Sequence, residues 1–105
     1  MDLAVQFEKE LEDKMYLAKR DCKYPATRFR QMLKEYGGVE TAKRLIQEGI
    51  NGKVSEGFTT LAYFEQRPDL TLEDSVCKSE YQSLFTHEEV EYCMKMLSSK
   101  GDGPL

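Results

Sequence analysis

Apolar residues recur every three or four positions through most of the chain, which is the spacing of one face of an α-helix. The first such stripe predicts a helix over residues 2–21 and consists of Leu3, Phe7, Leu11, Met15 and Ala18. The second stripe predicts a helix over residues 25–36 and consists of Phe29, Met32, Leu33 and Tyr36. Pro25 suits the first position of that helix, where its missing N–H costs nothing, and Gly37-Gly38 suits its end.

Three more helices are predicted, over residues 39–48, 56–66 and 71–83. The turn pair Asn51-Gly52 separates the first two of them, and Pro68 separates the second from the third. Ser55 and Thr71 are candidate N-caps, because their hydroxyls can accept a hydrogen bond from an N–H of the first helical turn.

The last helix has the most complete starting signal. Thr86 and Glu89 have the spacing of a capping box, in which each side chain accepts a hydrogen bond from the other residue's N–H. The flanking apolar residues Phe85 and Val90 have the spacing of a hydrophobic staple. Gly101 is the predicted stop.

These elements predict the fold class. No segment alternates apolar and polar residues as a half-buried strand would. The 105 residues are an ordinary length for one domain. We therefore predict an all-α fold, a compact bundle of five to six short helices in a single domain over residues 1–98, with a flexible C-terminal tail over residues 99–105.

The chain lacks the groupings that common catalytic and metal sites need. Cys22, Cys77 and Cys93 share no CxxC spacing, so we expect buried or half-buried thiols rather than disulfides or a zinc site. The one histidine, His87, stands among acidic residues at the start of a helix, and we expect it at the surface. A nucleophilic Ser or Cys usually needs a histidine base. We therefore predict a protein that is not an enzyme and that uses no metal or cofactor.

The distribution of apolar residues also bears on location. No apolar run is long enough for the core of a signal peptide or for a membrane-spanning helix. We therefore expect a cytoplasmic protein without a membrane partner.

Charge is unevenly distributed along the chain, although the net charge is only −4. Residues 14–34 are strongly basic, and residues 71–92 are strongly acidic. The candidate surface for a partner or an anion consists of Lys19, Arg20, Lys23, Arg28, Arg30 and Lys34. Two arrangements remain open, since this basic surface is either available for binding or covered by the acidic last third of the chain.

Several large apolar side chains fall beside the predicted core stripes rather than on them. They are Tyr16, Leu17, Tyr63, Phe64 and Tyr92. They either complete the core or form a patch for a partner protein.

Five short motifs occur in order along the chain. They are YPATRFRQML at 24–33, GGVETAKRL at 37–45, SEGFTTL at 55–61, DLTLE at 69–73 and LFTHEE at 84–89. In this order they resemble the pattern YxPxRFxxML, GG…A…L, SxGFxxL, DLTxE and LFTxEE of a family of small, uncharacterised prokaryotic helical proteins. The resemblance covers about residues 16–98 and implies a helical domain, without implying an activity.

These observations favour a non-enzymatic protein–protein interaction or regulatory module. In a bacterium or a phage, such a module could inhibit or regulate a nucleic-acid enzyme. The alternative is a nucleic-acid-binding protein that uses the basic segment 14–34, with an affinity that falls steeply as salt rises. One form of this alternative is a helix-turn-helix over residues 39–66.

Overall fold

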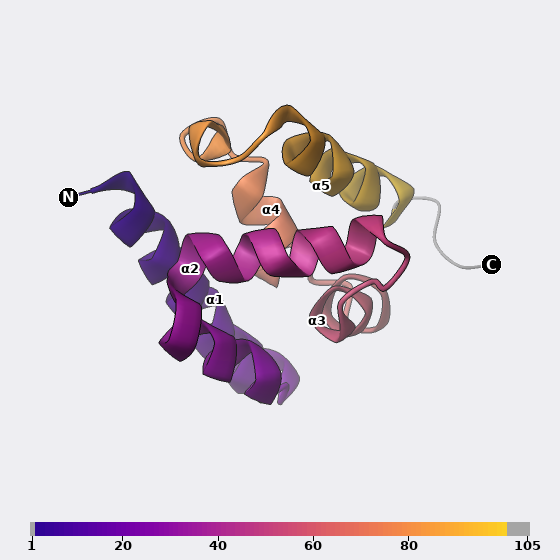
Figure 1. Ribbon diagram of the computed structural model, residues 1–105. Coiled ribbons are helices and arrows are strands. Elements are labelled where there is room, and N and C mark those ends of the chain that lie inside the picture. The colour runs from indigo at the N-terminus through magenta and orange to yellow at the C-terminus, as the bar shows by residue number, and fades with distance from the viewer. Residues whose placement is uncertain (1, 101–105) are drawn as a thin grey trace.

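The computed structural model describes residues 2–100, and the regular elements among them are all helical (Figure 1). The α-helices are α1 (Leu3–Cys22), α2 (Thr27–Ile50), α3 (Glu56–Phe58), α4 (Leu72–Val76) and α5 (His87–Lys100). Shorter turns lie between them, namely a π-helical stretch η1 (Thr59–Phe64) that continues α3, and the 3₁₀ turns η2 (Pro68–Leu70) and η3 (Gln82–Leu84). The predicted all-α compact bundle is confirmed.

Helix α2 folds back on itself at Gly37, where the sequence predicts the boundary between two helices. Gly37 has φ 81° and ψ 175°, a backbone conformation that favours glycine. The two arms of α2, residues 27–36 and 38–50, therefore point in different directions (Figure 1). If α2 were a straight helix, Arg28 and Glu48 would lie about 30 Å apart. Here their side chains are 2.7 Å apart, because the fold-back brings the two ends of α2 together.

Helix α1 packs directly against this fold-back. The Gly38 N–H donates a hydrogen bond of 2.9 Å to Oε1 of Glu8, so a side chain of α1 caps the second arm of α2. The two backbones are so close that a Cβ atom at Gly38 would lie 2.7 Å from Cα of Glu8. Glycine at this position is therefore a condition for the approach of α1 to α2.

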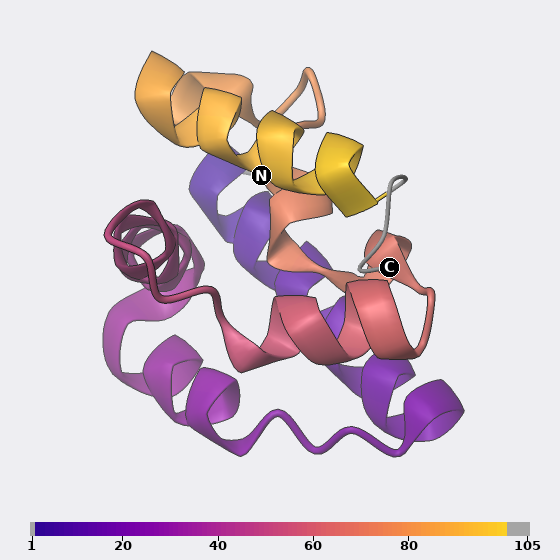
Figure 2. The same cartoon turned by 90° about the vertical axis from the view of Figure 1, so that its right-hand side faces the viewer.

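The core lies where α1 passes α4, α5 and both arms of α2, the first of which contributes Met32 and Leu33. The predicted stripe of α1 is confirmed, since Phe7, Leu11 and Ala18 are buried and Leu3 and Met15 pack against the core. Figure 2 shows α5 at one end of the molecule and the first arm of α2 at the opposite end. A smaller apolar cluster joins α1 to the η1 and η2 turns through Ala18, Leu61 and Leu70.

The three predicted N-caps are confirmed. The hydroxyls of Ser55, Thr71 and Thr86 each accept a hydrogen bond from the N–H three residues later, at 3.1, 3.3 and 3.1 Å. Glu89 completes the capping box by accepting from the N–H of Thr86 at 2.8 Å. Helix α5 includes residues 99 and 100 of the predicted tail, and residues 101–105 of that tail lie outside the described residues.

The predicted start of the second helix at Pro25 is wrong. Helix α2 begins at Thr27, and Ala26 before it has the left-handed conformation φ 49°, ψ 47°. Lys23, which ends α1, is also left-handed, with φ 56° and ψ 30°. These two left-handed residues turn the chain sharply between α1 and α2. Pro25 therefore lies in the short connection between the helices and not in α2.

The predicted helix over residues 71–83 is also wrong in extent, because α4 ends at Val76. Val76 and Tyr81 are both buried in the main core. Positions five residues apart lie about 140° apart around an α-helix. A continuous helix could not turn both side chains into the core. The chain breaks instead, and the Tyr81 ring packs edge-to-face on Phe7 at 5.2 Å.

We expect Gly38→Ala to lower the free energy of unfolding by about 1–3 kcal/mol, because the new methyl group meets the backbone of α1, which cannot rotate away. Urea denaturation followed by circular dichroism measures this. Gly57→Ala is the matched control, since a Cβ there meets only the Tyr24 hydroxyl at an ordinary 3.7 Å. Equal denaturation midpoints for the two variants would show that the approach of α1 to Gly38 is not a constraint.

Candidate functional site

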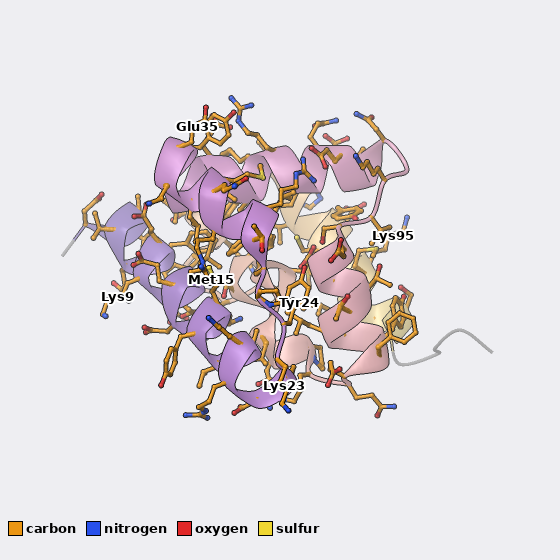
Figure 3. All side chains as sticks on the ribbon, turned by 90° about the horizontal axis from the view of Figure 1, so that it is seen from below. Lys9, Met15, Lys23, Tyr24, Glu35 and Lys95 are labelled. Atoms are coloured by element: carbon orange, nitrogen blue, oxygen red, sulfur yellow. The ribbon has the colours of Figure 1, made fainter. Side chains whose placement is uncertain are left out.

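The structure places the six residues of the predicted basic surface on two neighbouring elements. Lys19 and Arg20 lie in the last turn of α1, and Lys23 follows that helix. The other three, Arg28, Arg30 and Lys34, lie on the first arm of α2. All six are exposed, and Figure 3 shows Lys23 at the edge of the molecule with Tyr24 turned inward beside it.

Two of these six residues are paired within the chain. Arg28 forms a bidentate ion pair with Glu48, with N–O distances of 2.7 and 3.2 Å. Its hydrogen bonds lower the pKa of the Glu48 carboxyl, although the partial burial of that group acts in the opposite direction. Arg20 pairs with its neighbour Asp21 at 2.7 Å. These two arginines are therefore less available to an external anion than the sequence suggests.

The acidic last third does not pair with the six basic residues anywhere in residues 2–100. Glu89 of α5 pairs instead with Lys43 of α2, at 2.8 Å. Another basic residue of the 14–34 segment, Lys14, does pair with the last third, through Asp74 of α4. The structure thus leaves the predicted basic surface uncovered by the acidic segment.

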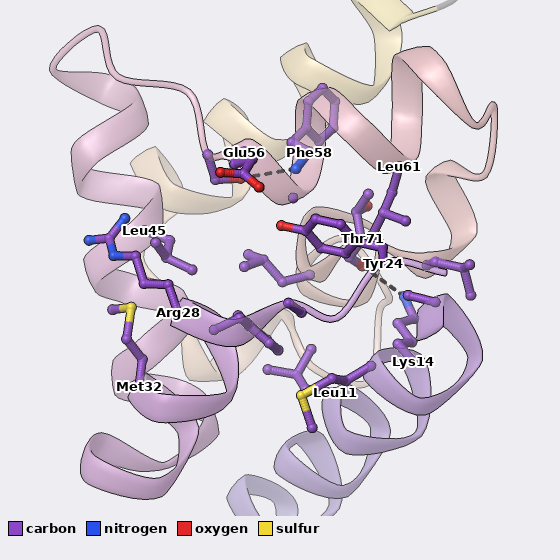
Figure 4. Close-up of a pocket in the computed structure, with 18 of the residues that line it drawn as sticks. Leu11, Lys14, Tyr24, Arg28, Met32, Leu45, Glu56, Phe58, Leu61 and Thr71 are labelled. Carbon is purple, nitrogen blue, oxygen red and sulfur yellow. Dashed lines mark hydrogen bonds between the residues drawn. The ribbon is translucent and has the colours of Figure 1, made fainter. Parts of the chain in front are cut away.

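A cleft of about 740 Å³ opens beside this surface, between the end of α1, the two ends of α2 and the α3–η1 segment (Figure 4). Most of its wall is apolar, and these lining residues include Leu11, Met15, Phe29, Met32, Leu45, Phe58, Leu61 and Leu70. The volume lies in the range of roughly 300–1,000 Å³ that is typical of ligand pockets. The fold-back of α2 forms the cleft, because it sets the two arms on either side.

The mouth of the cleft is polar. Arg28 and Glu48 line it from the two arms of α2, and their ion pair bridges those arms. Lys53 lies on the connection to α3, Glu56 is the first residue of α3, and both are exposed. Between them, Val54 is 40% exposed and extends the apolar wall to the surface.

Lys14 lies at the inner end of the cleft, and its ammonium group already has hydrogen-bond partners within the chain. Its ammonium group donates to the carbonyl oxygen of Thr71 and to Oδ2 of Asp74, both at 2.9 Å (Figure 4 shows the first bond). Burial lowers the pKa of Lys14, and the bond to Asp74 opposes that change. Glu10 stands 3.9 Å away on α1 and accepts a 2.6 Å hydrogen bond from Ser75 of α4. This polar contact joins α1 to α4.

Glu73 is the unusual group of the cleft. It lies on α4, lines the cleft and is only 4% exposed. Burial raises its pKa to about 7. Its own N–H and the charge of Lys14 favour the carboxylate, but they do not offset the loss of hydration. A buried carboxyl that is near half-ionised at neutral pH can serve as a hydrogen-bond donor or as a counter-ion.

The thiols closest to Glu73 are poor nucleophiles. Burial raises the pKa of Cys77 to about 11 and also raises that of Cys93, which disfavours reactive thiolates. His87 is not among the lining residues, and its side chain is 92% exposed beside Glu91. Within residues 2–100, no group of three His, Cys, Asp or Glu side chains could hold a metal ion.

The predictions for the thiols and for His87 are confirmed in their placement. Cys93 is buried, Cys22 and Cys77 are half-buried, and all three are unbridged.

None of the helices in the described part of the chain is long and apolar enough to cross a membrane.

The five large apolar side chains that fall beside the predicted core stripes divide into two groups. Tyr16 and Phe64 are exposed, at 66% and 77%. The other three contribute to packing, since Leu17 joins the smaller cluster, Tyr63 packs edge-to-face on Phe58, and Tyr92 lies against Gly49. A single continuous patch of these five residues therefore does not form.

Comparison of the chain with known proteins finds no matching family model, no matching characterised protein and no matching solved structure. The resemblance to the prokaryotic helical family stays a prediction.

The sequence pattern alone did not single out Glu73, which counted only as part of the acidic segment 71–92. A signal is present, because Glu73 stands three and four positions before Val76 and Cys77, on the apolar side of α4. It also missed that Lys14 is buried, since its partners Thr71 and Asp74 are 57 and 60 residues away in the chain.

We expect the free energy of unfolding to fall by up to about 3 kcal/mol as the pH rises from 5 to 8. This is the contribution of Glu73, whose pKa of about 7 in the folded protein exceeds the ordinary value of 4.5 for a glutamate. The folded state binds this proton more tightly than the unfolded chain, so raising the pH favours unfolding. Urea denaturation across this pH range should show the decline in the native chain and its absence in Glu73→Gln.

Glu80→Gln is the matched control, because Glu80 is exposed and does not line the cleft. It should keep the decline of the native chain. The same pH dependence in the native chain and in Glu73→Gln would contradict the raised pKa of Glu73.

Proposed function

We propose that this chain is a non-enzymatic binding module that receives an apolar segment of another protein in the cleft between α1, α2 and α3–η1. The observation that carries this proposal is the cleft itself, with an apolar wall and a polar mouth. This is the anatomy of a protein interface, in which an apolar centre is surrounded by a polar rim.

The exposed apolar surface at the mouth supports a protein partner. Val54 is 40% exposed at the edge of the cleft, and Phe29 on the opposite side is half-buried. A partner segment that enters the cleft would cover both side chains. The polar groups of Gln31 and Lys53 at the mouth can then hydrogen-bond to its main chain.

The cleft is also held open before any partner arrives. The Arg28–Glu48 ion pair links the two arms of α2, and the bonds of Lys14 to Thr71 and Asp74 link α1 to α4. A preformed site loses less conformational entropy on binding than one that must first be ordered.

The nucleic-acid alternative has less support from the contacts of the basic surface. Arg28 and Arg20 are neutralised by Glu48 and Asp21, which removes two of the six candidate cations. The exposed lysines Lys19, Lys23 and Lys34 support that alternative.

Selection of a random peptide library on the native protein tests the proposal. We expect enriched peptides with apolar anchor residues. Their dissociation constants should rise at least about tenfold, which is 1.4 kcal/mol, in two variants that alter the cleft. Val54→Asp places a charge at the mouth, and Leu61→Trp reduces the space inside.

Val5→Asp is the matched control, because Val5 is also exposed, at 53%, but does not line the cleft. The selected peptides should bind this variant as they bind the native chain. Two results would overturn the proposal: a selection without enrichment, or peptides that bind both cleft variants with undiminished affinity.

A further inference from the structure

We propose that the partner segment carries an acidic side chain beside its apolar residues, and that Arg30 binds this carboxylate at the edge of the cleft. This inference rests on the proposed function and names the polar residue type that accompanies the apolar anchors of the partner. It follows from the way in which the arginines of the chain are paired and from the place of Arg30 beside the cleft.

Arg30 is the one arginine that has no carboxylate partner anywhere in residues 2–100. Each of the other four forms an ion pair with an aspartate or glutamate of the chain, at N–O distances of 2.7 to 3.6 Å; these four are Arg20, Arg28, Arg44 and Arg67. A guanidinium is always charged, and its planar fork of donors matches the two oxygens of a carboxylate. Arg30 is therefore available to a carboxylate from outside the chain.

The guanidinium of Arg30 lies at the edge of the cleft. Its Nη2 donates a hydrogen bond of 3.4 Å to the carbonyl oxygen of Pro25, and Pro25 lines the cleft together with its neighbours Tyr24 and Ala26. This bond is long, and it occupies only one of the five N–H donors of the guanidinium. The remaining donors can bind a carboxylate on a segment that lies in the cleft.

The exposed charges around the cleft add to the attraction for an acidic residue. Lys53 lines the cleft, and Lys23 lies in the connection between α1 and α2 beside the lining residue Tyr24. Both lysines are exposed and form no ion pair within residues 2–100. The exposed carboxylate of Glu56 opposes them from α3. We therefore expect the acidic residue of the partner beside the α1–α2 connection and not beside α3.

A carboxylate matches this edge better than a phosphate group does. Sites for phosphorylated ligands usually gather several arginines. Arg20 and Arg28, the nearest arginines along the chain, are held by Asp21 and Glu48. The single free guanidinium balances the single charge of an Asp or Glu side chain. The apolar wall beside it can cover the apolar residues that flank the acidic one in a peptide.

The peptides from the library selection test this inference through their composition. We expect an aspartate or glutamate at a fixed spacing from the apolar anchors. The protein has a net charge of −4, so its overall field favours basic peptides. Enrichment of an acidic residue would therefore be a local effect of the cleft edge.

Variants of Arg30 measure its contact with the selected peptides by isothermal titration calorimetry. We expect Arg30→Gln to weaken binding about threefold, because it removes an attraction at a partly exposed edge. Arg30→Glu should weaken binding at least about tenfold, because it also adds a repulsion. Replacing the acidic residue of the peptide by its amide should weaken binding about threefold on the native protein and little on Arg30→Gln, which is the coupling expected of a direct contact.

Exchanging the two charges separates a direct ion pair from a general effect of net charge. A peptide with lysine in place of its acidic residue should bind Arg30→Glu at least about threefold more tightly than it binds the native protein. Lys95→Glu is the matched control, because it changes the net charge by the same amount at an exposed position of α5 that does not line the cleft. The acidic peptides should bind this variant within about twofold of the native affinity.

Competition with nucleic acids separates a carboxylate site from a phosphate site. We expect neither a DNA nor an RNA oligonucleotide to displace a selected peptide from the native protein. Displacement that Arg30→Glu abolishes would assign the cleft edge to phosphate groups and overturn the proposal.

Two further results would overturn the carboxylate site. They are selected peptides without an enriched acidic residue, and acidic peptides that bind Arg30→Glu as tightly as the native protein. If such peptides still lose affinity in Val54→Asp and Leu61→Trp, the carboxylate site is wrong and the proposed function stands. If no peptide depends on the cleft, the proposed function fails as well.

Discussion

The close contact between α1 and the fold-back of α2 determines most of the structure. Gly37 turns the chain through a conformation that favours glycine, and Gly38 lets the backbone of α1 approach within a distance that excludes a Cβ atom. Glu8 then accepts the hydrogen bond of the Gly38 N–H, which would otherwise lack a helical partner. Because α2 is bent at this contact, both of its arms reach the main core, the first through Met32 and Leu33 and the second through Ala42, Leu45 and Ile46. The cleft lies between the two ends of α2, beside α1 and the α3–η1 segment.

Two buried charged groups in the same region have opposite surroundings. Lys14 is surrounded by acceptors from α4 and the turn before it, so its charge is satisfied inside the protein. Glu73 lies on the same short helix as Asp74 and is only 4% exposed, and burial raises its pKa to about 7 although its own N–H and the charge of Lys14 favour the ionised form. Removing a charge from water is costly unless it is paired and hydrogen-bonded, and Lys14 meets that condition. The cost at Glu73 is reduced because its raised pKa favours the neutral acid.

The cleft is a better candidate site than the basic surface that the charge distribution suggests. The six basic residues are exposed, but Arg28 serves the fold by bridging the two arms of α2. The cleft has a polar mouth and a mostly apolar wall, and the exposed side chain of Val54 connects the wall to the surface. Burial raises the pKa values of the half-buried Cys77 thiol and of the buried Cys93 thiol, which disfavours their thiolate forms.

The sequence by itself determined the local features of this protein. The apolar stripe of α1, the caps at Ser55, Thr71 and Thr86, and the break at Gly37 all follow from interactions between residues within a few positions of each other. Only the tertiary structure decided the early end of α4, which depends on the packing of Tyr81 against Phe7 from α1. It alone also decided the burial of Lys14 and the Arg28–Glu48 bridge. These contacts join residues 20 to 74 positions apart, and their geometry depends on how the helices pack rather than on the pattern within any one helix.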